Sequence, residues 1–270
     1  MELTWWGHST ATVTDGGITV VTDPVLTDRI AHLRRRAGDS PPASVAAADD
    51  VLVSHLHADH LDVSSLRRLD PSATLVAPHG ARGVLRHRAP ALARRCLEVA
   101  PGDTVELGHV RVTATPAQHP GARGPWSRHT GQALGYLIDG GPPQSRVRTY
   151  FAGDTGLGAF LDDLTGIDAA LLPVGGWGPT LGPEHLDPVR AVEATRRLQP
   201  RLVVPIHYGT FWPVGLGWLR PNLFARPGPE YARLVRAAGL DVEVEVLHQG
   251  GSVEIAASRR SATQSDIGGR

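Results

Sequence analysis

The sequence is poor in cysteine and carries no net charge. It contains one cysteine in 270 residues, Cys96, and its 27 lysine and arginine residues balance 27 aspartate and glutamate residues. A single cysteine excludes an internal disulfide and fits a reducing compartment. Zero net charge argues against nucleic acid as an obligatory partner, because phosphate backbones are bound largely through accumulated positive charge.

Long apolar runs are also missing. No segment approaches the ~20 apolar residues needed to cross a bilayer, and the N-terminus lacks the charged-then-apolar pattern of a signal peptide. We therefore expect a cytoplasmic protein without stable membrane insertion. With 41% hydrophobic residues the chain can bury a large core, and we expect one domain over residues 1–256. Residues 257–270 hold almost no apolar side chain, which predicts a mobile tail.

Short apolar segments alternate with helical patterns along the chain. Strand patterns occur at residues 3–6, 11–14, 18–22, 51–54, 74–77, 110–115, 134–138, 149–152, 169–173, 202–206 and 242–246. Helical patterns occur at residues 64–69, 81–86, 188–198 and 229–238. This order predicts an α/β protein built as an αββα sandwich, with two mixed sheets flanked by helices and a site at one edge, between the sheets.

Four side chains that bind metals stand within one short turn, in the segment His55-Leu56-His57-Ala58-Asp59-His60. Imidazole nitrogens and carboxylate oxygens are the usual ligands of Zn²⁺ besides thiolates. His55 and His57 point the same way on an extended chain, and Asp59 and His60 follow where the chain must turn, so they can face a second metal. Chance clustering among 13 histidines is the alternative. The position after the apolar strand at residues 51–53 favours a binuclear metal site.

Three more polar residues follow apolar strands. His119 comes after the strand at residues 110–115, Asp154 after residues 149–152 and His207 after residues 202–206. Taken singly, each could be a loop histidine or an aspartate that serves a turn. As a set with the four residues above they supply seven metal ligands, which coincidence explains poorly.

The chain at this point resembles the metallo-β-lactamase fold hydrolases. The resemblance is closest to the branch with N-acyl-phosphatidylethanolamine-hydrolysing phospholipase D and the ascorbate-phosphate lactonase relatives. It is carried by residues 5–10, 22–24, 54–62, 115–119, 151–156, 173–175, 185–188 and 206–211. The phospholipase relatives have a longer N-terminal region with membrane-contacting segments that this chain does not match.

The resemblance implies a division of the ligands between two divalent ions. His55, His57 and His119 would hold one ion, Asp59, His60 and His207 the other, and Asp154 would bridge them. Zinc is the first expectation on ligand type, with manganese, iron or nickel as alternatives. Two ions close together stabilise a bridging hydroxide, because a bound cation lowers the pKa of water toward about 7.

The residues around the ligands carry less information. The family pattern places His185 on the open side as a donor to a substrate oxygen, and Asp59 and His185 are the expected catalytic residues; the alternative for His185 is a helix-entry residue. Trp177, in a loop rich in glycine and proline, is expected to line the substrate pocket with His185, whereas Trp218 is not. His8 either supports a metal ligand or pins the first hairpin. The basic runs at residues 34–36 and 94–95 could receive an anionic substrate or lie on a solvated helix face, and the helix face is expected.

Two functional classes follow. The first is a binuclear metal-dependent hydrolase acting on a small-molecule phosphodiester, lactone or related ester. The second is a metal-binding member of the same fold with a biosynthetic or sensing role. A degenerate member would be expected to lack ligands, and all seven are present, which favours hydrolysis.

Overall fold

The computed structural model describes residues 1–124, 126–176, 181–216, 218 and 222–257. Two seven-stranded sheets dominate these residues. The first sheet contains, in spatial order, β17 (Gly251–Glu254), β1 (Glu2–Gly7), β2 (Thr10–Asp15), β3 (Ile18–Thr22), β6 (Asp50–Leu52), β7 (Thr74–Pro78) and β8 (Cys96–Val99). The second contains β16 (Glu243–Val244), β14 (Leu202–Ile206), β13 (Ala169–Pro173), β12 (Val147–Phe151), β11 (Leu134–Gly140), β10 (Val110–Pro116) and β9 (Thr104–Leu107).

Both sheets are mixed and repeat one pairing pattern. In the first sheet the pairings from β17 to β3 are antiparallel and those from β3 to β8 are parallel. In the second the pairings from β9 to β12 are antiparallel and those from β12 to β16 are parallel. The two halves of the chain therefore share a topology.

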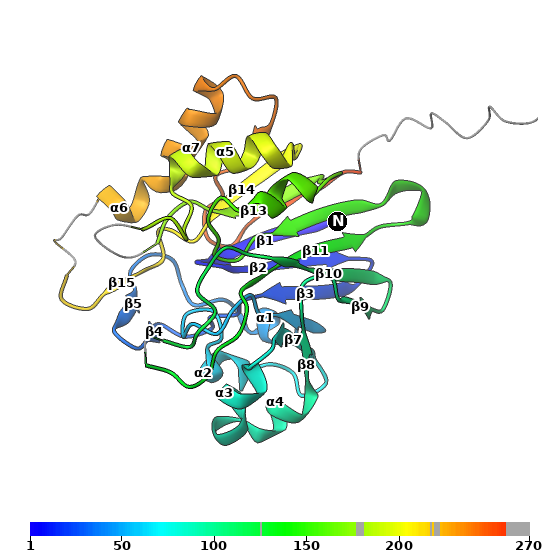
Figure 1. Cartoon of the computed structure of the whole chain (residues 1–270), viewed down its shortest axis with the longest axis vertical. Coiled ribbons are helices and arrows are strands. Elements are labelled where there is room, and N and C mark those ends of the chain that lie inside the picture. The colour runs from blue at the N-terminus through cyan, green and yellow to red at the C-terminus, as the bar shows by residue number, and fades with distance from the viewer. Residues whose placement is uncertain (125, 177–180, 217, 219–221, 258–270) are drawn as a thin grey trace, which may run out of the picture.

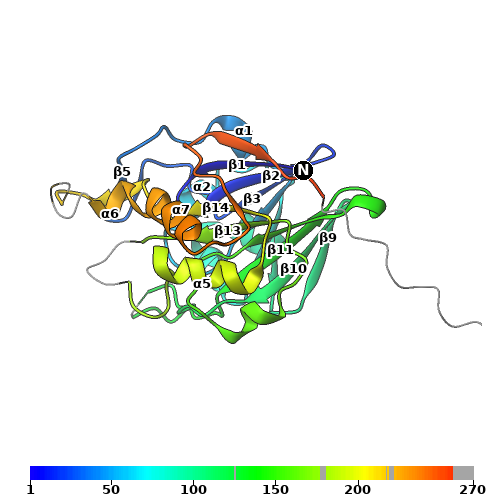
Figure 2. The same ribbon diagram turned by 90° about the horizontal axis from the view of Figure 1, so that it is seen from above.

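The sheets stack face to face and helices cover their outer faces (Figures 1 and 2). Successive side chains of a strand point to opposite faces of the sheet, so each strand contributes to the core between the sheets and to the core under the helices. Val20 packs between the sheets, whereas Val21 packs under helices on the outside of the first sheet. Phe151 packs between the sheets, whereas Tyr150 packs on the outside of the second sheet.

Different helices cover the two outer faces. The first sheet carries α1 (Ala43–Ala46), α2 (Val63–Leu66), α3 (Ala81–Arg88) and α4 (Pro90–Arg95), whose buried residues join one outer cluster. The second carries the 3-10 helix η2 (Ala159–Asp163), α5 (Pro188–Leu198) and α7 (Pro227–Ala237). The 3-10 helix η1 (Pro143–Ser145) and α6 (Asn222–Ala225) are short connections. The predicted αββα sandwich is confirmed.

A third sheet was not predicted. It consists of β15 (Phe211–Pro213), β5 (Leu33–Arg35) and β4 (Arg29–Ile30). The expectation of a solvated helix face at residues 34–36 is wrong, because Arg34 and Arg35 lie on β5 and the buried guanidinium of Arg35 stacks over the ring of Phe211, 4.7 Å from its centroid. Pairing between segments almost 180 residues apart leaves no local pattern.

Several predicted boundaries also shift. The helix expected at residues 64–69 is only α2, the strand expected at residues 242–246 is only β16, and the strands β8, β9 and β17 were not predicted. The expected tail lies outside the described residues from residue 258 onward. Among the described residues, no helix combines the length and the apolar character needed to span a membrane.

Candidate metal centre

The seven predicted ligands are brought together at one edge of the sandwich. His55 to His60 lie in the turn after β6, His119 follows β10, Asp154 follows β12 and His207 follows β14. In parallel sheets the carboxyl ends of the strands lie at one edge, where α/β folds commonly build sites. The shared edge explains how His60 and His207, 147 residues apart in sequence, become neighbours.

The first cluster consists of three histidine nitrogens. Nε2 of His55 lies 2.9 Å from Nδ1 of His57, and the same Nδ1 lies 3.2 Å from Nε2 of His119. These atoms converge as one group that could hold a metal ion. It is the grouping that the sequence predicted for one ion.

The second cluster contains Asp59, His60 and His207, joined by His8. Nε2 of His60 lies 3.3 Å from Nε2 of His207 and 3.8 Å from Oδ2 of Asp59. Nε2 of His8 lies 3.2 Å from the same Asp59 oxygen. The structure thus adds one histidine to the group predicted for the second ion.

Asp154 lies between the two clusters. Its Oδ2 is 3.4 Å from Nε2 of His60 and its Oδ1 is 3.3 Å from Nε2 of His207, and it also groups with His55 and with His119. The preceding residue, Gly153, has φ of +59°, and a Cβ there would lie 2.6 Å from Cβ of Ser54. Only glycine allows this turn to approach the histidine loop so closely.

The donor spacing fits divalent metals. In a tetrahedral site with bonds of about 2.0–2.1 Å, neighbouring ligand atoms are about 3.4 Å apart. The contacts within and between the clusters run from 2.9 to 3.8 Å. Oδ1 of Asp154 is buried and has no hydrogen-bond partner among the described residues, as expected of an atom that serves a cation.

The outward-facing nitrogens strengthen this fit. Four histidines place Nε2 in the clusters and hold Nδ1 against an acceptor outside them: His55 against Oγ of Ser54 at 3.0 Å, His60 against Oδ2 of Asp23 at 2.6 Å, His119 against the Glu184 carbonyl at 3.0 Å and His207 against the Gly175 carbonyl at 3.0 Å. A hydrogen on Nδ1 leaves the lone pair on Nε2 facing the cluster, which is the arrangement of metal-binding histidines.

Sequence reasoning missed two residues that hold this arrangement. Asp23 is fully buried and accepts from the backbone N–H of Ser54 at 2.7 Å, from Oγ of Ser54 at 2.6 Å and from Nδ1 of His60. Its position after β3 was a signal that could have been used. Arg123 donates to the carbonyls of Leu56 at 2.8 Å and Leu61 at 2.6 Å and so clamps the histidine loop; no local pattern marks it.

Backbone strain concentrates at the same place. Among the described residues other than glycine, five have positive φ, and three of these belong to the site: His8 at 53°, Asp23 at 34° and His207 at 64°. Such conformations cost free energy and persist where the surroundings fix them. They aim the three side chains inward from the ends of their strands.

The pKa of His60 is shifted in the opposite direction from the pKa values of three neighbouring histidines. Burial lowers the pKa of His57 to about 4 and of His207 to about 3, and burial beside His60 lowers the pKa of His55 well below its usual range. Burial alone would also lower the pKa of His60, but the carboxylates of Asp154 and Asp23 raise it well above its usual range. The carboxylates therefore favour the doubly protonated form of His60, whereas burial disfavours that form in His55, His57 and His207.

Burial by itself would raise the pKa values of the two carboxylates at the clusters. The neighbouring histidines outweigh this effect. They hold the pKa of Asp59 and of Asp154 well below the usual range. Both carboxylates are ionised at neutral pH and available to cations.

His185 lies beside the centre, with its side chain 29% exposed. Its ring contacts the ring of His119 at 4.6 Å between centroids, and Nε2 is 3.8 Å from Oδ2 of Asp154. The entry of α5 is capped by Asp187, whose carboxylate accepts from the backbone N–H of Arg190 at 2.8 Å. Asp187 supplies the cap, while the His185 carbonyl accepts from the guanidinium of Arg190 at 3.2 Å, so the His185 backbone also contacts α5.

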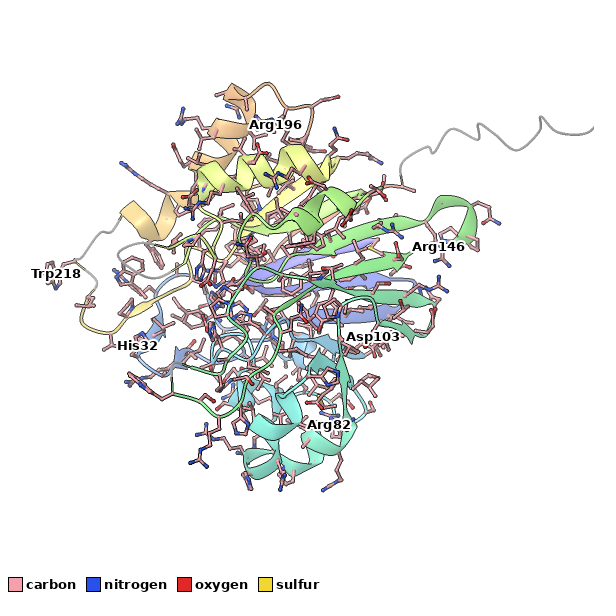
Figure 3. All side chains as sticks on the ribbon, in the orientation of Figure 1. His32, Arg82, Asp103, Arg146, Arg196 and Trp218 are labelled. Atoms are coloured by element: carbon pink, nitrogen blue, oxygen red, sulfur yellow. The ribbon has the colours of Figure 1, made fainter. Side chains whose placement is uncertain are left out.

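His8 makes contacts of both kinds that the sequence left open. Its side chain contacts Asp59, while its backbone N–H donates to Oγ1 of Thr210 at 2.8 Å and its carbonyl accepts from the N–H of His207 at 2.9 Å. Trp177 lies outside the described residues. Trp218 is 77% exposed and projects from the periphery (Figure 3).

Comparisons with known proteins agree with this geometry. Residues 19–208 match the model of the beta-lactamase superfamily domain. The chain is 31% identical over 265 residues to a UPF0173 metal-dependent hydrolase of Methanopyrus kandleri, covering 94% of this chain and all of the relative. The chain belongs to the metal-dependent hydrolase family of the beta-lactamase superfamily.

Solved structures show the same fold. A metallo hydrolase from the archaeon Ignicoccus hospitalis superposes with a TM-score of 0.68 at 26% identity, covering 93% of this chain and 97% of that one. An isothiocyanate hydrolase from Delia radicum gut bacteria superposes with a TM-score of 0.71 at 17% identity, covering 95% and 100%. The superfamily resemblance seen in the sequence is confirmed, and the closer resemblance to the phospholipase and lactonase branch stays a prediction.

Proposed function

We propose that this member of the superfamily is a hydrolase with two divalent metal ions. His55, His57 and His119 would hold one ion, Asp59, His60 and His207 the other, with Asp154 between them. The observation that carries the proposal is the set of four histidines whose Nδ1 atoms are each held outside the clusters while Nε2 faces inward. Zinc suits this set of nitrogen and carboxylate donors best, with manganese, iron or nickel as alternatives.

Bound ions would supply Lewis-acid activation of water and of a substrate oxygen. The chain's own residues orient the reaction. Asp59 presents an ionised carboxylate held by His8, and Asp154 spans the two clusters. His185, beside the centre and partly exposed, donates a hydrogen bond or a proton to the substrate oxygen.

The chemistry is hydrolysis of a small-molecule phosphodiester, lactone or related ester. Each of these needs activated water and stabilisation of charge on an oxygen, and none needs a nucleophilic side chain. The single cysteine, Cys96, is buried on β8, and burial raises the pKa of its thiol to about 12. A thiol in that state does not act as a nucleophile.

The test combines metal analysis with a substrate screen. The purified chain is expected to contain about two divalent ions, to lose them to a chelator and to recover them on zinc titration. Bis(p-nitrophenyl) phosphate, a set of lactones and a β-lactam are then assayed with the metal-free and the reloaded protein. His109→Ala is a matched control, because His109 pairs with Asp15 away from both clusters. A protein that binds no metal, or that hydrolyses nothing when loaded, contradicts the proposal.

A further inference from the structure

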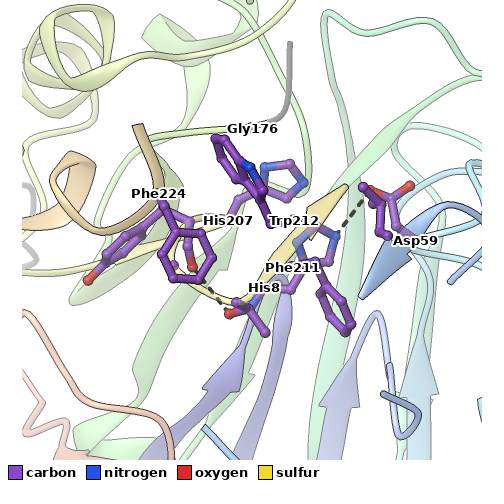
Figure 4. Close-up of a pocket in the computed structure, with 11 residues that line it drawn as sticks. His8, Asp59, Gly176, His207, Phe211, Trp212 and Phe224 are labelled. Atoms are coloured by element: carbon purple, nitrogen blue, oxygen red, sulfur yellow. Dashed lines mark hydrogen bonds and ion pairs between the residues drawn. The ribbon is translucent and has the colours of Figure 1, made fainter. Parts of the chain in front are cut away.

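The two metal-binding clusters are supported in different ways. In the second cluster the ring of His8, which follows β1, contacts the Asp59 carboxylate (Figure 4). In the first cluster His119 lies on a loop, and the acceptor that its Nδ1 faces is the carbonyl of Glu184 at 3.0 Å. The support for His119 therefore comes from a second loop, residues 182–187, which precedes α5.

This second loop carries two groups that face the first cluster. Besides the Glu184 carbonyl, it presents the ring of His185, which meets the ring of His119 edge to face at 4.6 Å between centroids. Nε2 of His185 is also 3.8 Å from Oδ2 of Asp154. One loop thus sets both the acceptor of a candidate metal ligand and the position of the expected substrate donor.

The same loop packs tightly against the turn that carries Asp154. A Cβ on Gly156 would lie 2.2 Å from the carbonyl oxygen of Pro183, so only glycine fits there. The backbone N–H of Gly156 donates to the carbonyl of Gln118, the residue before His119, at 2.9 Å. Three loops meet at this point, and a displacement of one of them changes the surroundings of both candidate ligands.

Arg190 holds the loop from the first turn of α5. Its Nη1 donates to the carbonyl of His185 at 3.2 Å and to the carbonyl of Gly182. These two carbonyls lie on either side of Glu184 along the chain. The guanidinium therefore fixes the ends of the segment that contains the acceptor of His119.

The place of Arg190 in the helix supports this task. It is the third residue of α5, near the positive end of the helix dipole, where a cation is unfavourable. The helix cap is supplied by Asp187, not by Arg190. The side chain thus opposes the helix that carries it, and its favourable contacts are those with the loop.

We propose that Arg190 is a positioning residue of the metal centre. By holding the loop, it keeps the Glu184 carbonyl against Nδ1 of His119, so that Nε2 of His119 faces the cluster with a lone pair. It also keeps the ring of His185 beside the reacting centre. This second effect rests on the proposed function, because it needs His185 as the substrate donor, whereas the first does not.

The first arm of the experiment measures the tautomer of His119 in the metal-free protein. The chain is labelled with ¹⁵N-histidine, and long-range ¹H–¹⁵N spectra are recorded at about pH 8, where ordinary histidines are neutral. His119→Gln identifies the signal. The unaltered chain is expected to carry the hydrogen on Nδ1. Arg190→Met removes the guanidinium but keeps a side chain suited to a helix, and it is expected to give a mixture of both tautomers.

Two further variants test the cause. Arg190→Lys keeps the charge but presents a single ammonium group in place of a fork of donors, so its spectrum is expected to lie between the other two. Arg196→Met is the matched control, because Arg196 lies on the same helix and pairs with Glu193. A hydrogen held on Nδ1 of His119 in Arg190→Met, or an equal mixture in Arg196→Met, would overturn the proposal.

Zinc affinity and thermal unfolding form the second arm. Arg190→Met is expected to lower zinc affinity by about tenfold, the low end of the range for loss of an outer partner of a metal-binding histidine. The unfolding temperature of the metal-free variant is expected to stay the same or rise, because a cation leaves the start of the helix. A lower unfolding temperature with unchanged zinc affinity would assign Arg190 to the fold alone and contradict the proposal.

Kinetics at saturating zinc separate this inference from the proposed function. On an ester that the chain hydrolyses, Arg190→Met is expected to lower kcat by about tenfold through displacement of His185. A chain that hydrolyses no ester, but whose His119 tautomer and zinc affinity change in Arg190→Met, would support the positioning role and contradict hydrolysis. A chain that hydrolyses esters and keeps tautomer, zinc affinity and kcat in this variant would support hydrolysis and refute the positioning role.

Discussion

Replacing Asp23 with asparagine should weaken metal binding although Asp23 is not a predicted ligand. Three donors meet its two oxygens: the N–H of Ser54 reaches Oδ1, while Oγ of Ser54 and Nδ1 of His60 reach Oδ2. Asparagine keeps the shape and tolerates the φ of +34° at this position. It offers one oxygen in place of two, so one side of the carboxylate becomes an N–H₂ donor.

Both orientations of the new amide are unfavourable. With N–H₂ at the Oδ1 position, two donors face each other at Ser54, which leaves a buried N–H unsatisfied at a cost of about 1–3 kcal/mol. With N–H₂ at the Oδ2 position, His60 must accept through Nδ1 and carry its hydrogen on Nε2, the atom that faces the cluster. Loss of a carboxylate partner of a metal-binding histidine typically lowers affinity about 10–100-fold. We expect a decrease of this size at the site of His60.

The assay is zinc affinity measured by competition with a chelator, alongside thermal unfolding of the metal-free protein. Asp62→Asn is the matched control, because Asp62 caps α2 in the same loop, accepts from the N–H groups of Ser64 and Ser65, and can be replaced by another capping residue. The control should bind zinc as the original chain does. Unchanged affinity in Asp23→Asn would refute the role assigned to Asp23.

Three further predictions follow from the same geometry. Asp154→Ala should lower metal content at both clusters and remove essentially all hydrolysis, as measured by elemental analysis and ester assay; full activity would show that the ligand set is wrong. His185→Ala should keep metal content and folding while lowering kcat or kcat/KM by about 10²-fold or more; normal kinetics would remove its substrate role, and loss of metal would make it a ligand. Because the pKa of His60 is held well above its usual range, this histidine must release a proton when metal binds. Zinc affinity should therefore rise with pH and fall as pH is lowered, with proton release visible as a dependence of the binding heat on the buffer; affinity that does not vary with pH would contradict this assignment.

The positions of the candidate ligands were predictable because each follows from residues close in sequence. A short apolar run forms a buried strand, and the polar residue directly after it must lie at the strand's end. That reasoning marked His55, His119, Asp154 and His207, and parallel strands then bring such ends to one edge. The period-2 alternation that sends Val20 and Val21 to opposite faces is likewise a local property of extended backbone.

The rest was decided by contacts between distant segments. Asp23 accepts from a histidine 37 residues away, and Arg123 clamps a loop that lies 62 to 67 residues earlier. The third sheet depends on the pairing of β5 with β15, which put Arg34 and Arg35 on a strand where a helix face was expected. A residue's neighbours in sequence set its local conformation, but they do not determine which strand edge or loop it meets after folding. Only the order and register of the sheets determine those contacts.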